Sequence, residues 1–359
     1  MAKAQMLSAP ADAAVNAVTF GVCSAADPRI PPEARERCVN IVRMAAEIVA
    51  KGVKMPDGRP PNVVWTDVVI GGERDADVVA RQFREACVDA VIVTPDTWAF
   101  PQPTLMSLFS HLPKDIPINI TCGNNGPKPG MVYSHGVNGA LAQGGRLTTL
   151  NVGDWLPTGR KPRMTPETAG ALIDWCYGAL AAAGLKGRRV VIFGHDSMGI
   201  ETCLAHVIPT RNTFGIEITR LDMKLLADML TGGAYDKKEV KALRAWFNRY
   251  VGDRIELRDE VDDEKFNLSL AMYLIVRDIM DDLDAVGGGF QSQLEWGSDP
   301  RCVPMPVADP MESLFNSTFD HRGRKPAMPY ATESDAQGVL TMLVMTWLTG
   351  GNPPLFMDF

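Results

Sequence analysis

Two successive series of short apolar runs, each run followed by an amphipathic segment, constrain the fold of this chain more than any other feature. Such alternation is typical of βαβ units, which form parallel sheets. In the first series we expect strands at Val18–Cys23, Asn62–Ile70, Ala90–Thr94, Ile118–Thr121 and Leu147–Val152. The expected helices are Pro32–Lys51, Asp75–Cys87 and Thr104–Leu112, with one more after Gly136. The first part of the chain is therefore predicted to be an α/β domain.

The alternation restarts after Trp155–Arg163, a segment with prolines and basic residues that is typical of a linker. The second series is expected to contain strands at Arg189–Gly194 and Ile216–Leu221, and helices at Pro166–Gly184, from Ser197, and at Met223–Leu230, Lys237–Tyr250 and Glu264–Met280. Because 359 residues exceed what one hydrophobic core usually serves, two domains are expected. We predict an α/β fold of two successive Rossmann-like domains with parallel sheets, at residues 1–157 and 158–350.

Composition argues against several kinds of partner. The net charge is −7 and no basic block is present, so nucleic acid is not expected. The turn Gly194–Ile200 lacks the spacing of a phosphate-binding loop, which argues against a nucleotide. The N-terminus lacks a secretory signal, and the apolar segment Ala336–Leu348 is shorter than the ~20 residues that cross a bilayer, so no membrane partner is expected. Seven cysteines without a CxxC pair suit a reducing cytoplasm.

Two acids near the C-terminus, Glu333 and Asp358, are the main candidates for chemistry. Glu333 precedes the apolar helix, which Ser334 or Asp335 is expected to cap. The run Leu355–Met357 is expected to form a buried parallel strand with Asp358 at its carboxyl end. Helix starts and strand carboxyl ends share the ligand-binding edge of an α/β sheet, where two acids can hold a divalent cation and move protons. Alternatively, Glu333 complements a helix dipole and Asp358 is a polar strand end.

Other polar residues follow expected strands, where sheet-edge sites form, or lie in the glycine-rich stretch Gly287–Trp296. Arg29 and its neighbour Asp27 lie in the loop after the first strand. Trp98 lies in the loop after the third strand, where an indole can stack on a sugar face. Gln291 and Gln293 alternate with other residues after three glycines, so on a strand both amides would face one side and suit hydroxyl recognition. Solvated loops and core packing are the alternatives for these residues.

Seven short blocks between Val93 and Asp358 are similar, in sequence and in order, to the L-fucose isomerase family. They are VTP-x-x-W (Val93–Trp98), NGPKPG (Asn125–Gly130), SMGI (Ser197–Ile200), GFQ-x-Q-x-x-W (Gly289–Trp296), N-S-x-F-D (Asn316–Asp320), ATE-x-D (Ala331–Asp335) and LTG…LFMD (Leu348–Asp358). The resemblance implies a metal-dependent, cytoplasmic enzyme that interconverts an aldose and its ketose, acting on L-fucose, D-arabinose or a similar sugar through an enediol intermediate. An L-arabinose-type isomerase and a non-catalytic sugar-binding module are the alternatives.

The resemblance also implies a metal site. Family members hold a divalent metal, typically Mn²⁺, with a Glu, an Asp and a His, and Glu333 and Asp358 match the two acids. These acids are also expected to move the proton between C1 and C2. A metal that spans two sugar oxygens stabilises the enediolate charge, and paired carboxylates can act in turn as base and acid, so the chemistry of the residues agrees with the resemblance.

The remaining matches concern the sugar and the assembly. Gln291 and Met198 match residues that line the sugar site of the family. Arg29 and Trp98 match positions that reach the site of a neighbouring subunit, which implies a homo-oligomer, a hexamer by resemblance. The metal-binding His of the family lies in a third domain, of which residues 351–359 would be the start. We therefore expect this chain to be the N-terminal part of a longer enzyme and to be inactive alone.

Overall fold

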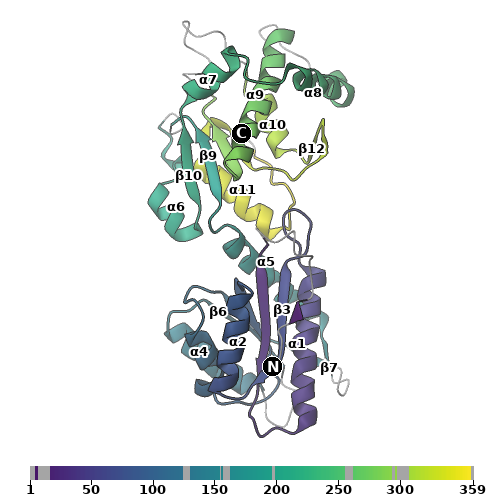
Figure 1. The fold of residues 1–359 in the computed structure, drawn as a ribbon, viewed down its shortest axis with the longest axis vertical. Helices are drawn as coiled ribbons and strands as arrows, with labels where there is room; N and C mark the ends of the chain where they lie inside the picture. Colours follow the sequence, from purple (N-terminus) through teal and green to yellow (C-terminus); the bar gives the residue numbers. More distant parts are fainter. Residues whose placement is uncertain are drawn as a thin grey trace. The chain divides into compact units, whose positions relative to one another are not determined.

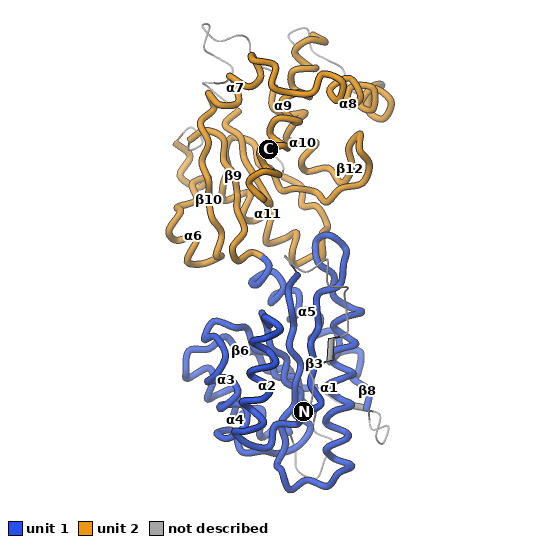
Figure 2. Tube along the Cα trace, in the orientation of Figure 1, with its two compact units in different colours: residues 1–184 blue, residues 185–359 orange. Residues whose placement is uncertain are grey.

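The structure is a computed structural model that describes residues 5–6, 17–123, 130–153, 155–156, 162–195, 199–254, 262–292, 296 and 307–356. The chain forms two compact units, Met1–Gly184 and Leu185–Phe359 (Figure 2). Each unit combines a largely parallel sheet with helices, which confirms the predicted α/β class of two successive Rossmann-like domains (Figure 1).

The first unit is built on a six-stranded sheet in the order β1-β3-β2-β4-β5-β6. Its strands are β1 (Gln5–Met6), β2 (Thr19–Ala25), β3 (Asn62–Ile70), β4 (Ala90–Val93), β5 (Ile118–Cys122) and β6 (Thr148–Val152). Strand β1 pairs antiparallel with β3, and the other five strands run parallel in the order of a flavodoxin-like sheet. The strand order reverses between β2 and β4, so the loops after these two strands lie where such sheets bind ligands.

Helices cover this sheet in two groups (Figure 1). They are α1 (Pro32–Gly52), α2 (Glu73–Glu85), the short turns η2 (Gln102–Met106) and α3 (Ser107–Ser110), α4 (Gly130–Gln143) and α5 (Pro166–Gly184). Helix α1 packs against α5, and α2 packs against η2 and α3. The buried residues of α1 recur at helical spacing, which fixes the face that it turns to the sheet: Cys38, Ile41, Val42, Ala45, Ala46 and Val49. Helix α4 begins before the expected Gly136 because its first turns are already buried at Tyr133.

Helix α5 places the boundary between the units later than the expected residue 157. Its residues contact α1, β5 and β6, and the Asn151 side chain on β6 donates a hydrogen bond to the Thr168 carbonyl at 3.2 Å. Trp175 packs edge-to-face on Phe20 of β2. The segment between β6 and α5 contains a short antiparallel pair, β7 (Trp155–Leu156) with β8 (Arg163–Met164). The first domain therefore includes a helix that was expected to begin the second.

The second unit contains a four-stranded sheet in the order β10-β9-β11-β14, with all strands parallel. The strands are β9 (Arg189–Phe193), β10 (Glu217–Leu221), β11 (Ala285–Phe290) and β14 (Tyr330–Ala331), beside a hairpin of β12 (Phe319–Asp320) and β13 (Gly323–Arg324). Its helices are α6 (Val207–Phe214), α7 (Met223–Thr231), α8 (Lys237–Tyr250), α9 (Asp263–Asp282), α10 (Asp309–Asn316) and α11 (Ala336–Leu348). Single 3-10 turns form at η3 (Glu201–Cys203), η4 (Gly252–Arg254) and η5 (Thr332–Ser334).

Strand β11 carries three consecutive glycines, which allow close packing on both of its faces. A Cβ atom at Gly288 would lie 2.7 Å from Cε2 of Tyr330, and one at Gly287 would lie 3.0 Å from the carbonyl oxygen of Pro329. These separations are shorter than ordinary van der Waals contacts. The glycines are therefore what lets β14 and the residues around it approach β11.

The expected strand after α11 does not form within the described residues. Residues 352–356 have no regular secondary structure, and Leu355 is 79% exposed. Gly350 and Gly351 have positive φ and two prolines without N–H groups follow, so the backbone turns away from strand pairing. The side chain of Phe356 nevertheless lies against the first turns of α11, because a Cβ atom at Gly338 would be 2.7 Å from its ring. Among the helices that the structure describes, none has the length and apolar character needed to span a bilayer.

Candidate active site at the sheet edge of the second unit

The carboxyl ends of β9, β11 and β14 bring three polar segments to one edge of the second sheet. His195 follows β9, Gln291 follows β11, and Glu333 follows β14. Because the strands are parallel neighbours, these segments lie side by side although Glu333 is far from His195 in the sequence. The carboxyl edge of a parallel sheet is where α/β proteins bind ligands, so the structure places Gln291 and Glu333 together in the expected kind of site.

Gln291 is fixed in place by the end of β9. Its backbone N–H donates to the Phe193 carbonyl at 3.0 Å, and its side-chain Oε1 accepts from the His195 N–H at 2.9 Å. The residue is 6% exposed. Gly194 makes this possible, since its φ is +97° and a Cβ atom there would lie 2.5 Å from Gln291 Oε1. The expectation that Gln291 alternates with Gln293 along a strand is wrong for Gln291, because β11 ends at Phe290; Gln293 lies outside the described residues.

Glu333 has an uncommon backbone conformation. Its φ and ψ are 56° and 22°, in the left-handed region, and Ser334 follows with a φ of 59°. Such conformations cost on the order of 1–3 kcal/mol each in a non-glycine residue and often occur at functional sites. The Ser334 hydroxyl donates to the Phe193 carbonyl at 3.3 Å, so the same carbonyl oxygen holds this turn and Gln291. The strained turn is therefore tied to the end of β9.

The cap of α11 is Asp335, one of the two residues expected there. Its carboxylate accepts a hydrogen bond from the Gly338 N–H at 2.7 Å. Glu333 lies two residues before this cap, so the helix start already has its own carboxylate. This geometry weakens the alternative in which Glu333 serves only the helix dipole.

Glu312 on α10 is a buried acid near this site that the sequence analysis did not single out. It is 7% exposed, and burial, followed by the charge of Asp309, raises its pKa to about 8. The charge of Glu333 acts in the same direction, whereas a hydrogen bond with Thr332 acts in the opposite one. Helical spacing indicated its burial, because Glu312 is three residues before Phe315 and therefore lies on the same buried face of α10.

Arg29 and Trp98 lie in the first unit, at the carboxyl ends of β2 and β4. Arg29 donates from Nε and Nη2 to the carboxylate of Asp27, at 2.9 and 2.6 Å. The Asp27 N–H donates to the Trp98 carbonyl at 2.9 Å. Asp27 thus brings Arg29 and Trp98 together, whereas Gln291 and Glu333 belong to the other unit.

A largely buried ion pair joins α1 to the loop after β4, two residues before Trp98. Arg37 donates to Asp96 at 2.7 Å, and their side chains are 18% and 8% exposed. The ion pair therefore helps to hold the loop that carries Trp98.

Two of the predicted site residues, Met198 and Asp358, lie outside the described residues. Among the residues that are described, no group of three or more His, Cys, Asp or Glu side chains is arranged to hold a metal ion. Glu333 is therefore the one predicted metal ligand that the structure places. The described part of the chain does not form a complete cation site by itself.

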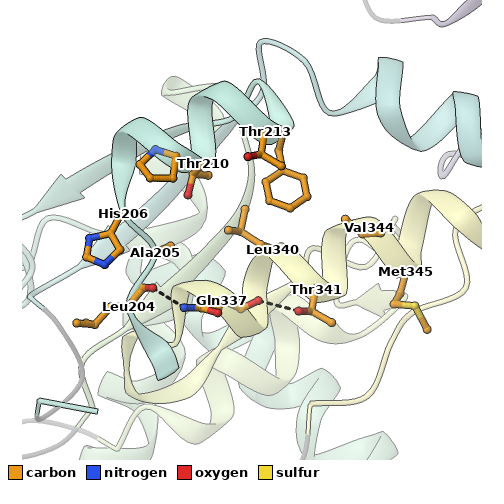
Figure 3. Close-up of a pocket in the computed structure, with 12 residues that line it drawn as sticks. Leu204, Ala205, His206, Thr210, Thr213, Gln337, Leu340, Thr341, Val344 and Met345 are labelled. Carbon is orange, nitrogen blue, oxygen red and sulfur yellow. Dashed lines mark hydrogen bonds between the residues drawn. The ribbon is translucent and has the colours of Figure 1, made fainter. Parts of the chain in front are cut away.

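A pocket of about 460 Å³ lies between α6 and α11 (Figure 3). Thr210 on α6 and Leu340 and Met345 on α11 line it, and Gln337 spans one end by donating to the Leu204 carbonyl at 2.6 Å. None of the predicted site residues that the structure describes lines this pocket. The site at the strand ends and the pocket along α11 are therefore separate features.

These features define an α/β protein whose two largely parallel sheets carry polar residues at their carboxyl edges. Two family models match the chain: "L-fucose isomerase, first N-terminal domain" over residues 17–187, and "L-fucose isomerase, second N-terminal domain" over residues 188–350. Their junction is close to the boundary between the two compact units. Because the two matches together span residues 17–350, the chain belongs to the L-fucose isomerase family.

Curated relatives agree with this assignment. The chain is 26% identical over 341 residues to the L-fucose isomerase of Phocaeicola vulgatus, 25% over 339 to that of Bacteroides fragilis and 24% over 342 to that of Streptococcus pneumoniae. The matches cover 88% to 89% of this chain. The chain spans about half the length of these relatives, 56% in each case.

Proposed function

We propose that this chain provides the two N-terminal domains of a metal-dependent aldose–ketose isomerase. The substrate would be L-fucose, D-arabinose or a similar sugar, converted through an enediol intermediate. The observation that carries the proposal is the position of Glu333, in a strained left-handed turn beside Gln291 at the carboxyl edge of the second sheet. Family membership supports the same activity.

In this proposal Glu333 and Asp358 transfer the proton between C1 and C2. One carboxylate removes the C2 proton, which leaves an enediolate. Transfer of the O2 proton to O1 and return of a proton to C1 then give the ketose; general acid–base catalysis of this kind contributes about 10²–10⁴-fold. Phe356, two residues before Asp358, lies against Gly338 in the helix that follows Glu333. This contact supports the inclusion of Asp358 in the proposed pair of acids.

The same two acids are the proposed ligands of Mn²⁺ or another divalent cation. Such a cation, when bound, would stabilise the negative charge on the sugar oxygens of the enediolate. Two carboxylates leave most coordination positions unfilled, so further ligands must come from groups outside the described residues, and this chain alone is expected to bind the metal poorly.

Gln291 and Met198 are proposed to contact the sugar. The side-chain oxygen of Gln291 already accepts a hydrogen bond from the His195 N–H. The side-chain NH₂ is therefore the group proposed to bind a sugar hydroxyl. Arg29 and Trp98, which Asp27 joins in the first unit, are proposed to reach the site of a neighbouring subunit in a homo-oligomer, a hexamer by resemblance.

Ketose formation tests the proposal. L-fucose, D-arabinose and L-arabinose are incubated with Mn²⁺ and either this chain or a chimera in which the C-terminal remainder of the Phocaeicola vulgatus enzyme follows it. We expect ketose from the chimera and little from the chain alone. In the chimera, Glu333→Gln should lower kcat at least about 100-fold, whereas Ser313→Ala, at an exposed position on α10, should not. Sugar binding without ketose formation, unchanged in Glu333→Gln, would indicate a binding module and overturn the proposal.

A further inference from the structure

Strand β14 is only two residues long, yet it leads directly into the turn that carries Glu333. On one side it pairs with β11, with Tyr330 opposite Gly288. The Gly288 N–H donates to the Pro329 carbonyl at 2.9 Å on this side. So short a strand makes few ladder bonds, and the position of the turn therefore depends on what holds β14 from its other side.

The side chain of Asn316 takes the place of a second neighbouring strand. Its Nδ2 donates to the Tyr330 carbonyl at 2.7 Å, and its Oδ1 accepts from the Tyr330 N–H at 3.0 Å. Facing residues of an antiparallel pair exchange the same two kinds of bond. A side-chain amide can reproduce them because it carries a donor and an acceptor on one planar group, whereas an ionised carboxylate has no donor.

Helix α10 fixes Asn316 in this orientation and adds contacts of its own. The Asn316 Nδ2 also donates to the Glu312 carbonyl at 3.1 Å, one turn earlier in the helix. The adjacent Phe315 is buried and stacks on the Tyr330 ring, with centroids 4.7 Å apart and planes 13° apart. The Phe315 carbonyl accepts from the Met328 N–H at 2.8 Å. The end of α10 thus holds both the backbone and the ring of Tyr330.

The turn that carries Glu333 is held on its other side as well. The Ser334 hydroxyl donates to the Phe193 carbonyl at 3.3 Å, and the Asp335 N–H donates to the Thr332 carbonyl at 3.1 Å. Glu333 therefore lies between a clamp on the backbone before it and a tie to β9 after it. A left-handed residue persists when its surroundings hold it in this way.

We propose that Asn316 is a positioning residue, which acts through the Tyr330 backbone to hold Glu333 at the edge of the second sheet. The value of this support for catalysis rests on the proposed isomerase function, whereas the support itself does not. Loss of the two bonds to Tyr330 should loosen β14 and the turn after it, and it should leave the distant helix α8 and the first unit unchanged.

Hydrogen exchange on the 359-residue chain tests this support without sugar or metal. We expect Asn316→Ala to speed amide exchange in peptides that cover residues 328–335 about tenfold, because the Tyr330 N–H and carbonyl lose their partner. Peptides from residues 237–250 should exchange as in the wild type. Ser313→Ala, at an exposed position on the same helix, is the matched control.

Asn316→Asp keeps the shape of the side chain and makes the test specific to hydrogen bonding. At pH 7 the ionised carboxylate can accept from the Tyr330 N–H but cannot donate to its carbonyl, so exchange should again be faster than in the wild type. As the pH falls toward about 4, the carboxyl gains a proton to donate. The ratio of its exchange rate to that of the wild type should then fall, whereas the ratio for Asn316→Ala should not.

Kinetics of the chimera connect the support to catalysis. In the chimera, Asn316→Asp at pH 7 should lower kcat per folded enzyme about 10- to 100-fold, because the Glu333 carboxylate is misplaced. The KM for the sugar should change little, since Gln291 follows β11 and not β14. Ser313→Ala should leave both constants unchanged.

Three results would overturn the proposal. Exchange at residues 328–335 could be unchanged in both Asn316 variants, or it could rise equally throughout the second unit, which would mean general destabilisation. In an active chimera, Asn316→Asp could keep the wild-type kcat. Failure of the isomerase function would be seen instead as absence of ketose from the unsubstituted chimera, and it would leave the exchange results intact.

Discussion

The carboxylate of Asp27 accepts three hydrogen bonds from Arg29, one from the backbone N–H and two from the guanidinium group. The Asp27 side chain is 1% exposed and that of Arg29 is 73% exposed. A buried acid thus holds an exposed base at the point where the strand order of the first sheet reverses. The acid also raises the pKa of Arg29 through this hydrogen bond.

The two partners should respond differently to mutation. Asp27→Ala removes, from a buried position, the acceptor for the Arg29 backbone and side chain, so it should lower the unfolding midpoint of the first unit. Arg29→Ala removes a side chain that is mostly in solvent and should leave that midpoint nearly unchanged. Thermal unfolding of the two variants checks the contrast. Equal destabilisation by both would contradict the assignment of the structural role to Asp27.

Gly194→Ala should destabilise the second unit. The new Cβ atom would collide with Gln291 Oε1, and the positive φ of +97° disfavours any side chain. Overpacking adds about 1–3 kcal/mol to a conformational cost of about 1–2 kcal/mol. Gly199→Ala is the matched control, because Gly199 also has a positive φ but no atom lies within 4 Å of its Cβ position. Denaturant unfolding should therefore show a larger loss for Gly194→Ala; similar losses would mean that Gln291 moves aside.

An ion network between α8 and α9 predicts a pH dependence of stability. Glu239 accepts hydrogen bonds from Arg277 at 2.8 Å and from His321 Nε2 at 2.9 Å, and it forms an ion pair with Arg322 at 2.6 Å. The hydrogen bond from Arg277, with the other positive groups, lowers the pKa of Glu239 to about 2. Because the pKa in the folded state is below the unfolded value, this stabilisation is complete above the unfolded pKa of about 4.3. It is lost as the pH falls toward 2.

Substitution of Glu239 by Gln should therefore lower the free energy of unfolding at pH 7, and the difference from the wild type should shrink as the pH falls from about 4.3 toward 2. Urea unfolding across this range measures it. A difference that stays constant with pH would show that the charge of Glu239 is not what stabilises the fold.

Lys325 predicts a second rise of stability with pH, at alkaline pH. Its Nζ donates to the carbonyl oxygens of Phe315 and Ser317, near the end of α10, and burial lowers its pKa to about 8. The unfolded chain therefore binds more protons than the folded one between pH 8 and about 10.4. Stability of the wild type relative to Lys325→Met should rise across this interval, as measured by urea unfolding. A flat difference would contradict the lowered pKa.

The regular elements followed closely from sequence periodicity. Helix α5 occupies Pro166–Gly184 and helix α8 occupies Lys237–Tyr250, both as expected, because the proline that begins α5 and the Asp236 cap of α8 are local features. The domain to which α5 belongs depends on its packing against α1, which no local pattern indicates. The strand expected at Leu355 was wrong because an apolar run needs a pairing partner as well as apolar residues.

The candidate site was predictable to a similar degree. Sequence analysis placed Glu333 at the carboxyl edge of a parallel sheet, and the family resemblance placed Gln291 in the sugar site. It did not predict the left-handed turn at Glu333, because that conformation is imposed by tertiary contacts at Phe193. It also passed over Glu312, whose burial results from the packing of α10 against α9 and β14.

The three glycines of β11 also limit how sequences of this kind can vary. Glycines leave space beside the strand that neighbouring side chains fill. Tyr330 and Met280 occupy the space beside Gly288. An alanine at position 288 could therefore be accepted only together with smaller residues at one of these positions. Among homologous sequences, we expect positions 280, 288 and 330 to change together rather than one at a time.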